Sequence, residues 1–149
     1  MPCGSNYHFF RHDVQPMWED PENAQGGKWT LNLPKNKRDS IDNFWLNVLL
    51  GIIGEAFGSD ELNDEICGIV FAPRQKQDRI SLWTKHVAPA AVIEQVGRKF
   101  KEFMGIEDEL RISFQQHEDA IKSTSATPSS TPGSIYAGGA KDSRELYVL

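Results

Sequence analysis

The sequence has few of the residues that mark several common protein classes. Only two cysteines, Cys3 and Cys67, occur among its 149 residues, which excludes a disulfide framework and a cysteine-based metal cluster. They indicate reduced thiols, and so a cytoplasmic protein that is also compatible with the nucleus. No apolar run reaches the roughly 18 residues of a membrane-spanning helix. The N-terminus also lacks the apolar stretch of a secretory signal, so we expect no membrane partner.

An excess of positive charge is missing as well. The net charge of -5 excludes general coating of nucleic acid, so any nucleotide or RNA contact must come from a small local site. The sequence contains no serine elbow, no glycine-rich phosphate loop and no metal-ligand spacing. The four histidines are scattered; they are His8, His12, His86 and His117. We therefore expect a protein that is not an enzyme and that needs no catalytic residue, metal or cofactor.

The composition is that of a globular domain. Hydrophobic residues make up 39% of the chain and charged residues 25%, which is typical of a soluble fold with a real core. We expect a single domain over residues 1–149. Residues 123–143 are rich in Ser, Thr, Pro, Gly and Ala, and they cannot bury enough apolar surface to offset the entropy of ordering. This segment is predicted to be a flexible loop.

Hydrophobic periodicity predicts an α+β fold. Alternating or continuous apolar residues predict strands at 7–14, 28–33, 66–71, 80–84, 110–114 and 146–149. Apolar residues at helical spacing predict a helix over 41–57, and a second helix that begins at Pro89 and stops at Gly105. Residues 20–27 have the composition of a loop. The sum is an antiparallel sheet with helices on one face.

The first candidate site is the pair Trp18-Glu19, in the run Met17-Trp18-Glu19-Asp20. It places an aromatic face beside a carboxylate. Such a pair suits a flat, positively charged purine with N–H donors along one edge, because the ring attracts the cation and the carboxylate accepts from the donors. The 7-methylguanine of an mRNA cap is such a ligand. A lone Trp-Glu pair is otherwise most often an ordinary strand-end feature.

The second candidate site is a hairpin with three cations, Arg74, Lys76 and Arg79, which is closed by Trp83. Three cations in six residues form a local anion site, for which an oligophosphate is a natural ligand. The alternative is a solvated hairpin with ordinary surface charge, and the hairpin alone favours that interpretation.

The third candidate site is a row on the 41–57 helix. Leu46, Leu50 and Gly54 form one line outside the main apolar stripe, which makes a shallow groove for an amphipathic partner helix. The alternative is that both leucines pack under a neighbouring element of the same protein. The helix alone favours this alternative.

Together these residues resemble the eukaryotic translation initiation factor 4E family, the mRNA 5′ cap-binding proteins. The resemblance covers most of residues 1–122, and its joint pattern is highly specific. The matching segments are 16–20, 26–29, 44–46, 49–50, 53–55, 67–70, 83–84 and 97–98, with Arg74, Lys76, Asp78 and Ile80. It implies a curved antiparallel sheet, with about six strands in this chain and two helices on the convex face.

The resemblance also implies roles for single residues. Trp18 would stack on the methylated guanine, Glu19 would accept from its N1 and N2 donors, and Trp83 would contact the N7-methyl group. Cap phosphates would be held by Arg74 and Arg79 with Lys76 nearby. Leu46, Leu50 and Gly54 would belong to the surface that binds the 4G scaffold and its competitors, the 4E-binding proteins.

The sequence departs from the family pattern in three places. Family members usually carry lysine where Arg79 stands, and the 123–143 segment is longer than the usual loop. A family segment with two strands, one helix and the second stacking tryptophan precedes the point where this chain begins, so the chain matches an N-terminally truncated domain. Two hypotheses follow: a cap-binding initiation factor that recruits a 4G-type scaffold, or a partner-binding module or fragment with impaired cap binding. A nucleotide-directed enzyme is a third and weaker alternative.

Overall fold

Short strands and helices alternate along the chain in the computed structural model, which describes residues 3–106, 110–117 and 145–149. The strands are β1 (Tyr7–Phe10), β2 (Gly27–Pro34), β3 (Ile66–Ala72), β4 (Gln77–Thr84), β5 (Ser113–Gln116) and β6 (Glu145–Val148). The helices are α1 (Pro21–Ala24), the 3₁₀ helix η1 (Lys35–Ser40), α2 (Ile41–Ile53), α3 (Asp60–Glu65) and α4 (Ala90–Met104).

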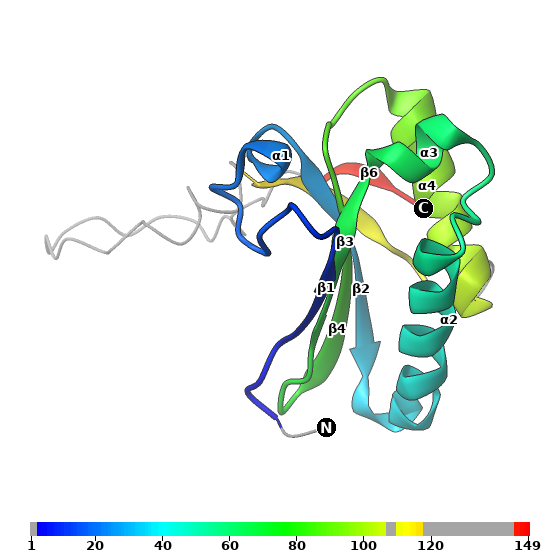
Figure 1. Ribbon diagram of the computed structural model, residues 1–149. Helices are drawn as coiled ribbons and strands as arrows, with labels where there is room; N and C mark the ends of the chain where they lie inside the picture. The colour runs from blue at the N-terminus through cyan, green and yellow to red at the C-terminus, as the bar shows by residue number, and fades with distance from the viewer. Residues whose placement is uncertain (1–2, 107–109, 118–144) are drawn as a thin grey trace, which may run out of the picture.

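The described strands form one six-stranded sheet in the order β1-β3-β4-β2-β5-β6, and every pairing is antiparallel. The longest ladder joins β2 to β4, from Gly27 opposite Thr84 to Pro34 opposite Gln77. Helices α2 and α4 cover one face, whereas α1 and the loop before it lie on the other side (Figure 1). The predicted α+β architecture, an antiparallel sheet with two long helices on one face, is confirmed.

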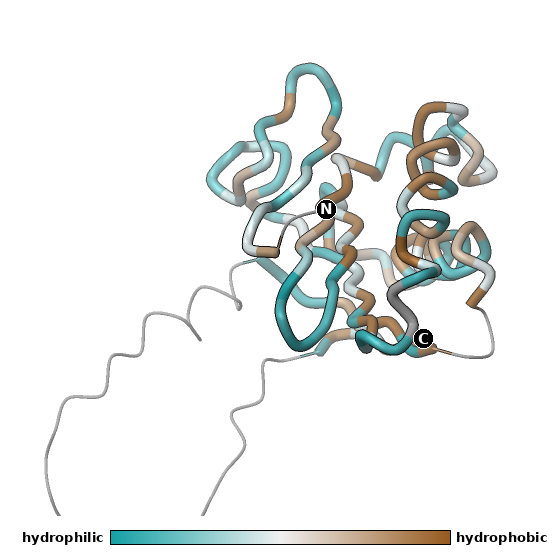
Figure 2. Tube along the Cα trace, turned by 90° about the horizontal axis from the view of Figure 1, so that it is seen from below, coloured by the Kyte–Doolittle hydropathy of each residue, from teal (hydrophilic) through white to brown (hydrophobic). Residues whose placement is uncertain are grey.

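Strand β2 shows how the sequence divides the two faces. Trp29, Leu31 and Leu33 are fully buried toward the helices, as their alternation predicts. The indole N–H of Trp29 donates to the carbonyl of Ile93 on α4 at 2.9 Å. A Cβ on Gly97 would lie 2.5 Å from the Trp29 ring, so only glycine lets α4 approach the sheet this closely. Hydrophobic stretches accordingly concentrate in strands and helices, while the turns are mostly hydrophilic (Figure 2).

Three helix predictions need correction. Helix α2 ends at Ile53 and not at 57, because Gly54 caps it and Glu55 takes a positive φ of 50°, which ends helical geometry. Residues 20–27 contain the short helix α1, whose N-cap Asp20 accepts from the Glu22 N–H. Helix α3 was not predicted. Ser59 caps it by accepting from the Leu62 N–H.

The strand bounds also differ from the predictions, mostly by a few residues. Strand β1 stops at Phe10, β4 begins at Gln77, and β5 runs from Ser113 to Gln116, later than predicted. The predicted stop of α4 is confirmed, since Gly105 caps the helix in the left-handed conformation. The predicted loop at 123–143 lies outside the described residues.

Candidate functional site

The face of the sheet that α2 and α4 leave uncovered has a polar floor. It is here called the helix-free face because neither long helix packs on it, although the short helix α1 lies on this side (Figure 1). Strand β4 directs Arg79, Ser81 and Trp83 to it, because side chains two apart in a strand share a face. The facing residues of β2, which are Lys28, Thr30 and Asn32, point to the same face. The Thr30 and Ser81 hydroxyls are buried and lie 3.2 Å apart. The two hydroxyls can therefore satisfy each other, and the middle of the floor, at Thr30 and Ser81, is polar and uncharged.

Trp83 is held by aromatic neighbours. Phe10 meets it edge-on, with ring centroids 5.4 Å apart, and His117 lies 4.2 Å away on the centroid measure. Phe10 can take this position because residue 68 is glycine. A Cβ on Gly68 would lie 2.5 Å from the Phe9 carbonyl oxygen and would collide with the Phe10 ring. Trp83 is half-buried and so remains partly exposed. The site therefore has a fixed aromatic wall that a ligand can reach.

His117 follows β5 and is almost fully buried. Burial, with a smaller contribution from the charge of Lys28, lowers the pKa of His117 to about 4. The ring is therefore neutral at pH 7, and its Nε2 has no hydrogen-bond partner. An uncharged ring beside Trp83 avoids repelling a cationic ligand. Sequence reasoning missed this residue, because a histidine after a strand has no pattern of its own.

Lys28 is a further cation that sequence reasoning missed. It lies opposite Trp83 on β4 and Gln115 on β5. Burial and the nearby charge of Arg79 lower the pKa of Lys28. The alternation of β2 could have indicated it, because Lys28 precedes the core residue Trp29 and must point to the opposite face.

The three hairpin cations lie at the far end of this face and differ in their contacts. Arg79 is exposed, and its Nε donates to the Asn32 Oδ1 at 3.2 Å. Lys76 is exposed. Arg74 is more engaged: Nη1 donates to the carbonyls of Ser5 and Pro73 at 3.2 and 3.0 Å, and Nη2 donates to the Asn6 Oδ1 at 2.6 Å. Arg74 therefore fastens the chain before β1 to the hairpin.

The hairpin itself is supported by a buried carboxylate. Asp78 is fully buried, and its Oδ1 accepts from the Lys35 Nζ at 2.7 Å and from the Arg74 N–H at 3.3 Å. An ion pair of this kind fixes geometry more than it adds stability. The cationic end of the face is thus anchored to η1, where Lys35 lies.

Trp18 and Glu19 belong to the loop before α1, and that loop lies on the side of the sheet away from α2 and α4 (Figure 1). Trp18 is 41% exposed, and Glu19 is also exposed. Among the described residues, the Trp18 ring packs against no other aromatic ring. Both side chains are available to a ligand, and the loop that carries them belongs to the same side of the sheet as Trp83.

The row on α2 is exposed as well. Leu46 and Leu50 are 52% and 58% exposed, so they do not pack under a neighbouring element, and the interpretation favoured by the helix alone is wrong. Ile53 continues the exposed surface, and Gly54 caps the helix. This surface belongs to the helical layer, on the side away from Trp83.

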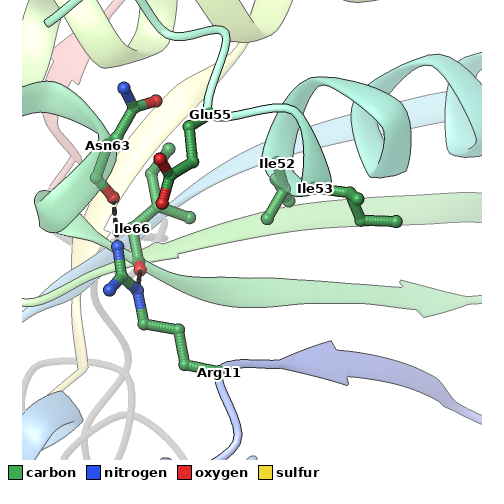
Figure 3. A pocket seen from close by; sticks show the side chains of 6 residues that line it. All are labelled: Arg11, Ile52, Ile53, Glu55, Asn63 and Ile66. Carbon is green, nitrogen blue, oxygen red and sulfur yellow. Dashed lines mark hydrogen bonds between the residues drawn. The ribbon is translucent and has the colours of Figure 1, made fainter. Parts of the chain in front are cut away.

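A pocket of about 170 Å³ lies at the C-terminal end of α2, apart from the helix-free face (Figure 3). Its lining residues are Arg11, Ile52, Ile53, Glu55, Asn63 and Ile66. The Arg11 guanidinium donates to the carbonyls of Ile66 and Asn63 at 2.8 and 2.6 Å. Arg11 therefore ties the exit of β1 to the start of β3, and the pocket shares Ile53 with the exposed surface of α2.

Comparison with known families decides the identity of the fold. The sequence model "Eukaryotic initiation factor 4E" matches residues 1–131. The chain belongs to the eukaryotic initiation factor 4E family. Among curated 4E proteins, it is 44% identical over 127 residues to the isoform 4E factor of Prunus domestica, covering 85% of this chain and 56% of that one. It is 40% identical over 126 residues to the 4E factor of Homo sapiens, covering 83% and 57%. The chain thus spans about half the length of the curated relatives it matches.

Solved 4E structures share the fold. One is Ascaris suum 4E-3 with an m7G cap, with a TM-score of 0.74 and 37% identity over 78% of this chain and 64% of that chain. Another is a schistosome 4E factor complexed with m7GpppA and a 4E-binding protein, with a TM-score of 0.79 and 31% identity over 100% and 72%. Within the part of this 4E chain that the structure describes, no helix has the length and apolarity to span a membrane.

Proposed function

We propose that this chain binds the 7-methylguanosine cap of mRNA on its helix-free face and acts in translation initiation by recruiting a 4G-type scaffold through α2. One observation carries the proposal: Trp83, Arg79 and the loop with Trp18 and Glu19 all lie on one side of the sheet. Solved members of the same family carry cap ligands on this fold. The role is binding without catalysis, in the cytoplasm.

The guanine would occupy the end of the face near α1. Trp18 would stack on the ring, where its exposed face attracts the delocalised positive charge of the methylated base. Glu19 would accept hydrogen bonds from the N1 and N2 donors. Trp83 would face the N7-methyl group, with the neutral His117 behind it. The site discriminates by charge, because an unmethylated guanine is neutral and gains less from the aromatic faces.

The phosphates would lie toward the hairpin. Arg79 is four residues from Trp83 on β4, so its side chain lies on the same face at about 13 Å along the strand. Lys76 and Lys28 would add positive charge at either side. Arg74 would contribute its charge to the same end, while its Nη donors hold Ser5 and Asn6. An oligophosphate that extends from the guanine fits this spacing of aromatic and cationic groups.

Isothermal titration calorimetry with m7GTP and with GTP tests the cap proposal. We expect m7GTP to bind at least about tenfold more tightly, because a stacked cationic base gains up to about 2 kcal/mol from the aromatic face. Equal affinity for the two nucleotides would sink the proposal for this chain.

The second half of the proposal concerns the α2 surface. Leu46 and Leu50 are more than half exposed, and an amphipathic partner helix could bury both beside Gly54. The expected partners are 4G-type scaffolds and 4E-binding proteins, and a solved relative is complexed with a 4E-binding protein. The wild-type chain should retain a peptide with the pattern Tyr-x4-Leu-hydrophobic, and the Leu50→Asp variant should not retain it. Peptide binding without retention on cap resin would favour the alternative, a partner-binding module with impaired cap binding.

A further inference from the structure

The loop that carries Trp18 and Glu19 is braced by one buried side chain. Asn23 is fully buried in α1. Its Nδ2 donates to the carbonyl of Gln15 and to the carbonyl of Met17, each at 2.8 Å. Both partners are acceptors, so the amide orientation is fixed by chemistry: only the NH₂ group can face them. One amide group therefore holds two backbone positions, one and three residues before Trp18.

The second support of the loop is Asp20. Its Oδ2 accepts from the Gln15 N–H and its Oδ1 from the Glu22 N–H, both at 2.9 Å. The Asp20 N–H donates to the Met17 carbonyl at 3.2 Å. Trp18 and Glu19 are thus the two residues between a fixed Met17 and a fixed Asp20, so their backbone has little freedom even without a ligand.

Helix α1, which carries Asn23, is itself joined to the sheet. The Gly26 N–H donates to the Asn23 carbonyl at 2.9 Å, and a Cβ on Gly26 would overlap the Thr84 carbonyl of β4. The Cys67 Sγ of β3 lies 3.5 Å from the Glu22 carbonyl. Burial raises the pKa of Cys67 to about 12, so the thiol stays protonated and can donate to that carbonyl. Contacts from β3 and β4 thus fix α1.

From these contacts we infer that Asn23 is a positioning residue: its buried amide presents Trp18 and Glu19 to the ligand in a preorganised geometry. The inference rests on the proposed cap-binding function for its consequence, though not for its geometry. Asn23 touches no ligand atom in this view; it acts through the carbonyls of Gln15 and Met17. A side chain that fixes the residue contacting the ligand lowers the ordering cost of binding.

The variant Asn23→Asp tests the inference with almost no change in size. It replaces the NH₂ group by an oxygen that faces two carbonyl oxygens, so both hydrogen bonds are lost and replaced by repulsion. Asn43→Asp is the matched control, because Asn43 is exposed on α2 and makes the same change of charge. Asn23→Ala serves if the aspartate variant does not fold.

Amide hydrogen exchange measures the brace without any ligand. We expect exchange at residues 15–20 to rise at least about tenfold in Asn23→Asp, with no change at 29–33 of β2 and no change in Asn43→Asp. Unchanged exchange at 15–20 in both Asn23 variants would overturn the inference, whether or not the chain binds a cap.

Titration with m7GTP at pH 7.5 measures the consequence for binding. Asn23→Asp should weaken binding about tenfold in the wild-type background. The loss should be less than about threefold in a background with both Trp18→Ala and Glu19→Ala, where the two groups to be positioned are gone. An equal loss in both backgrounds would overturn the positioning role. A wild-type chain that does not prefer m7GTP to GTP fails the proposed function instead, and the exchange result then decides the brace alone.

Discussion

The two tryptophans of the proposed cap site are held in opposite ways. Trp83 stands on a central strand, between Phe10 and His117, where sheet register and ring packing set its position. Trp18 stands on a loop, has no aromatic neighbour among the described residues and is 41% exposed. Its position depends on two side chains that bond to the backbone: the Asn23 Nδ2 donates to the Gln15 carbonyl, and the Asp20 Oδ2 accepts from the Gln15 N–H. Stability and binding should therefore separate: Trp83 contributes to both, and Trp18 to binding alone.

Replacing each tryptophan by alanine should give the largest contrast. Trp83→Ala removes packing on two rings and should lower the free energy of unfolding by about 3 kcal/mol. Trp18→Ala should change it by less than about 0.5 kcal/mol and yet weaken m7GTP binding at least about tenfold. Urea unfolding and calorimetric titration of the two variants measure these effects. Equal destabilisation by both changes would contradict the comparison.

Acid should lower the stability of the folded chain through His117, which packs beside Trp83. The pKa of His117 is lowered to about 4 in the folded chain against 6.5 for the free group, so between these values the unfolded chain binds more protons. The contribution of His117 to the free energy of unfolding should therefore be fully present above about pH 6.5. The free energy of unfolding should fall by about 2–3 kcal/mol as the pH drops to about 4.

Urea unfolding at a series of pH values checks the histidine effect. His117→Gln should flatten the pH dependence between 6.5 and 4, whereas His12→Gln, at an exposed position, should keep it. A wild-type stability that does not change over this interval would rule out a buried neutral His117.

Replacing the two arginines of the hairpin should give smaller effects than replacing the tryptophans. Arg79 should affect ligand binding, whereas Arg74 should also affect the order of the chain before β1. Arg79→Met should weaken m7GTP binding about tenfold, because it removes one charge-assisted contact, and should leave stability within about 0.5 kcal/mol. Arg74→Met removes hydrogen bonds to Ser5 and Asn6 and should also loosen the chain before β1. Amide exchange at residues 5–10 should rise in Arg74→Met alone; a rise in both variants would contradict this division.

The smallest effect on stability is expected at α2. Leu50 is 58% exposed, so Leu50→Ser should change the free energy of unfolding by less than about 0.5 kcal/mol and leave m7GTP affinity unaltered. Retention of a Tyr-x4-Leu-hydrophobic peptide should nevertheless be lost. Binding of the peptide at wild-type strength would remove α2 from the proposed partner surface.

Local patterns in the sequence predicted the elements whose side chains follow a simple period. Strand β2 shows this, since Trp29, Leu31 and Leu33 alternate toward the core, and so does the stop of α4 at Gly105. Helices α1 and α3 were not predicted, because helices of four and six residues are too short to show a periodic pattern. Their N-cap residues Asp20 and Ser59 were the available indication.

The chemistry of the site divides in the same way. The aromatic and acidic residues could be named from the sequence because their types suit a cationic purine, and the resemblance to the 4E family placed them. The roles of Asn23 and His117 could not, because each depends on side-chain contacts that form only in the folded chain, whereas the alternation of β2 could have indicated Lys28. Asn23 acts through Gln15 and Met17, and His117 through Trp83. The folded loop before α1 creates the role of Asn23, and packing between distant segments creates that of His117.

The burial of Trp29 has an optical consequence. Its ring is inaccessible and its indole N–H is bound to the Ile93 carbonyl, while Trp45 packs against Phe71 on the helical side. A ligand on the opposite side of the sheet can reach only Trp18 and Trp83. Intrinsic emission should therefore fall to a plateau well above zero at saturation. The remaining emission would come from Trp29 and Trp45, whose signal reports whether the core is folded. One fluorescence titration can therefore measure both ligand occupancy and the folded state of the chain.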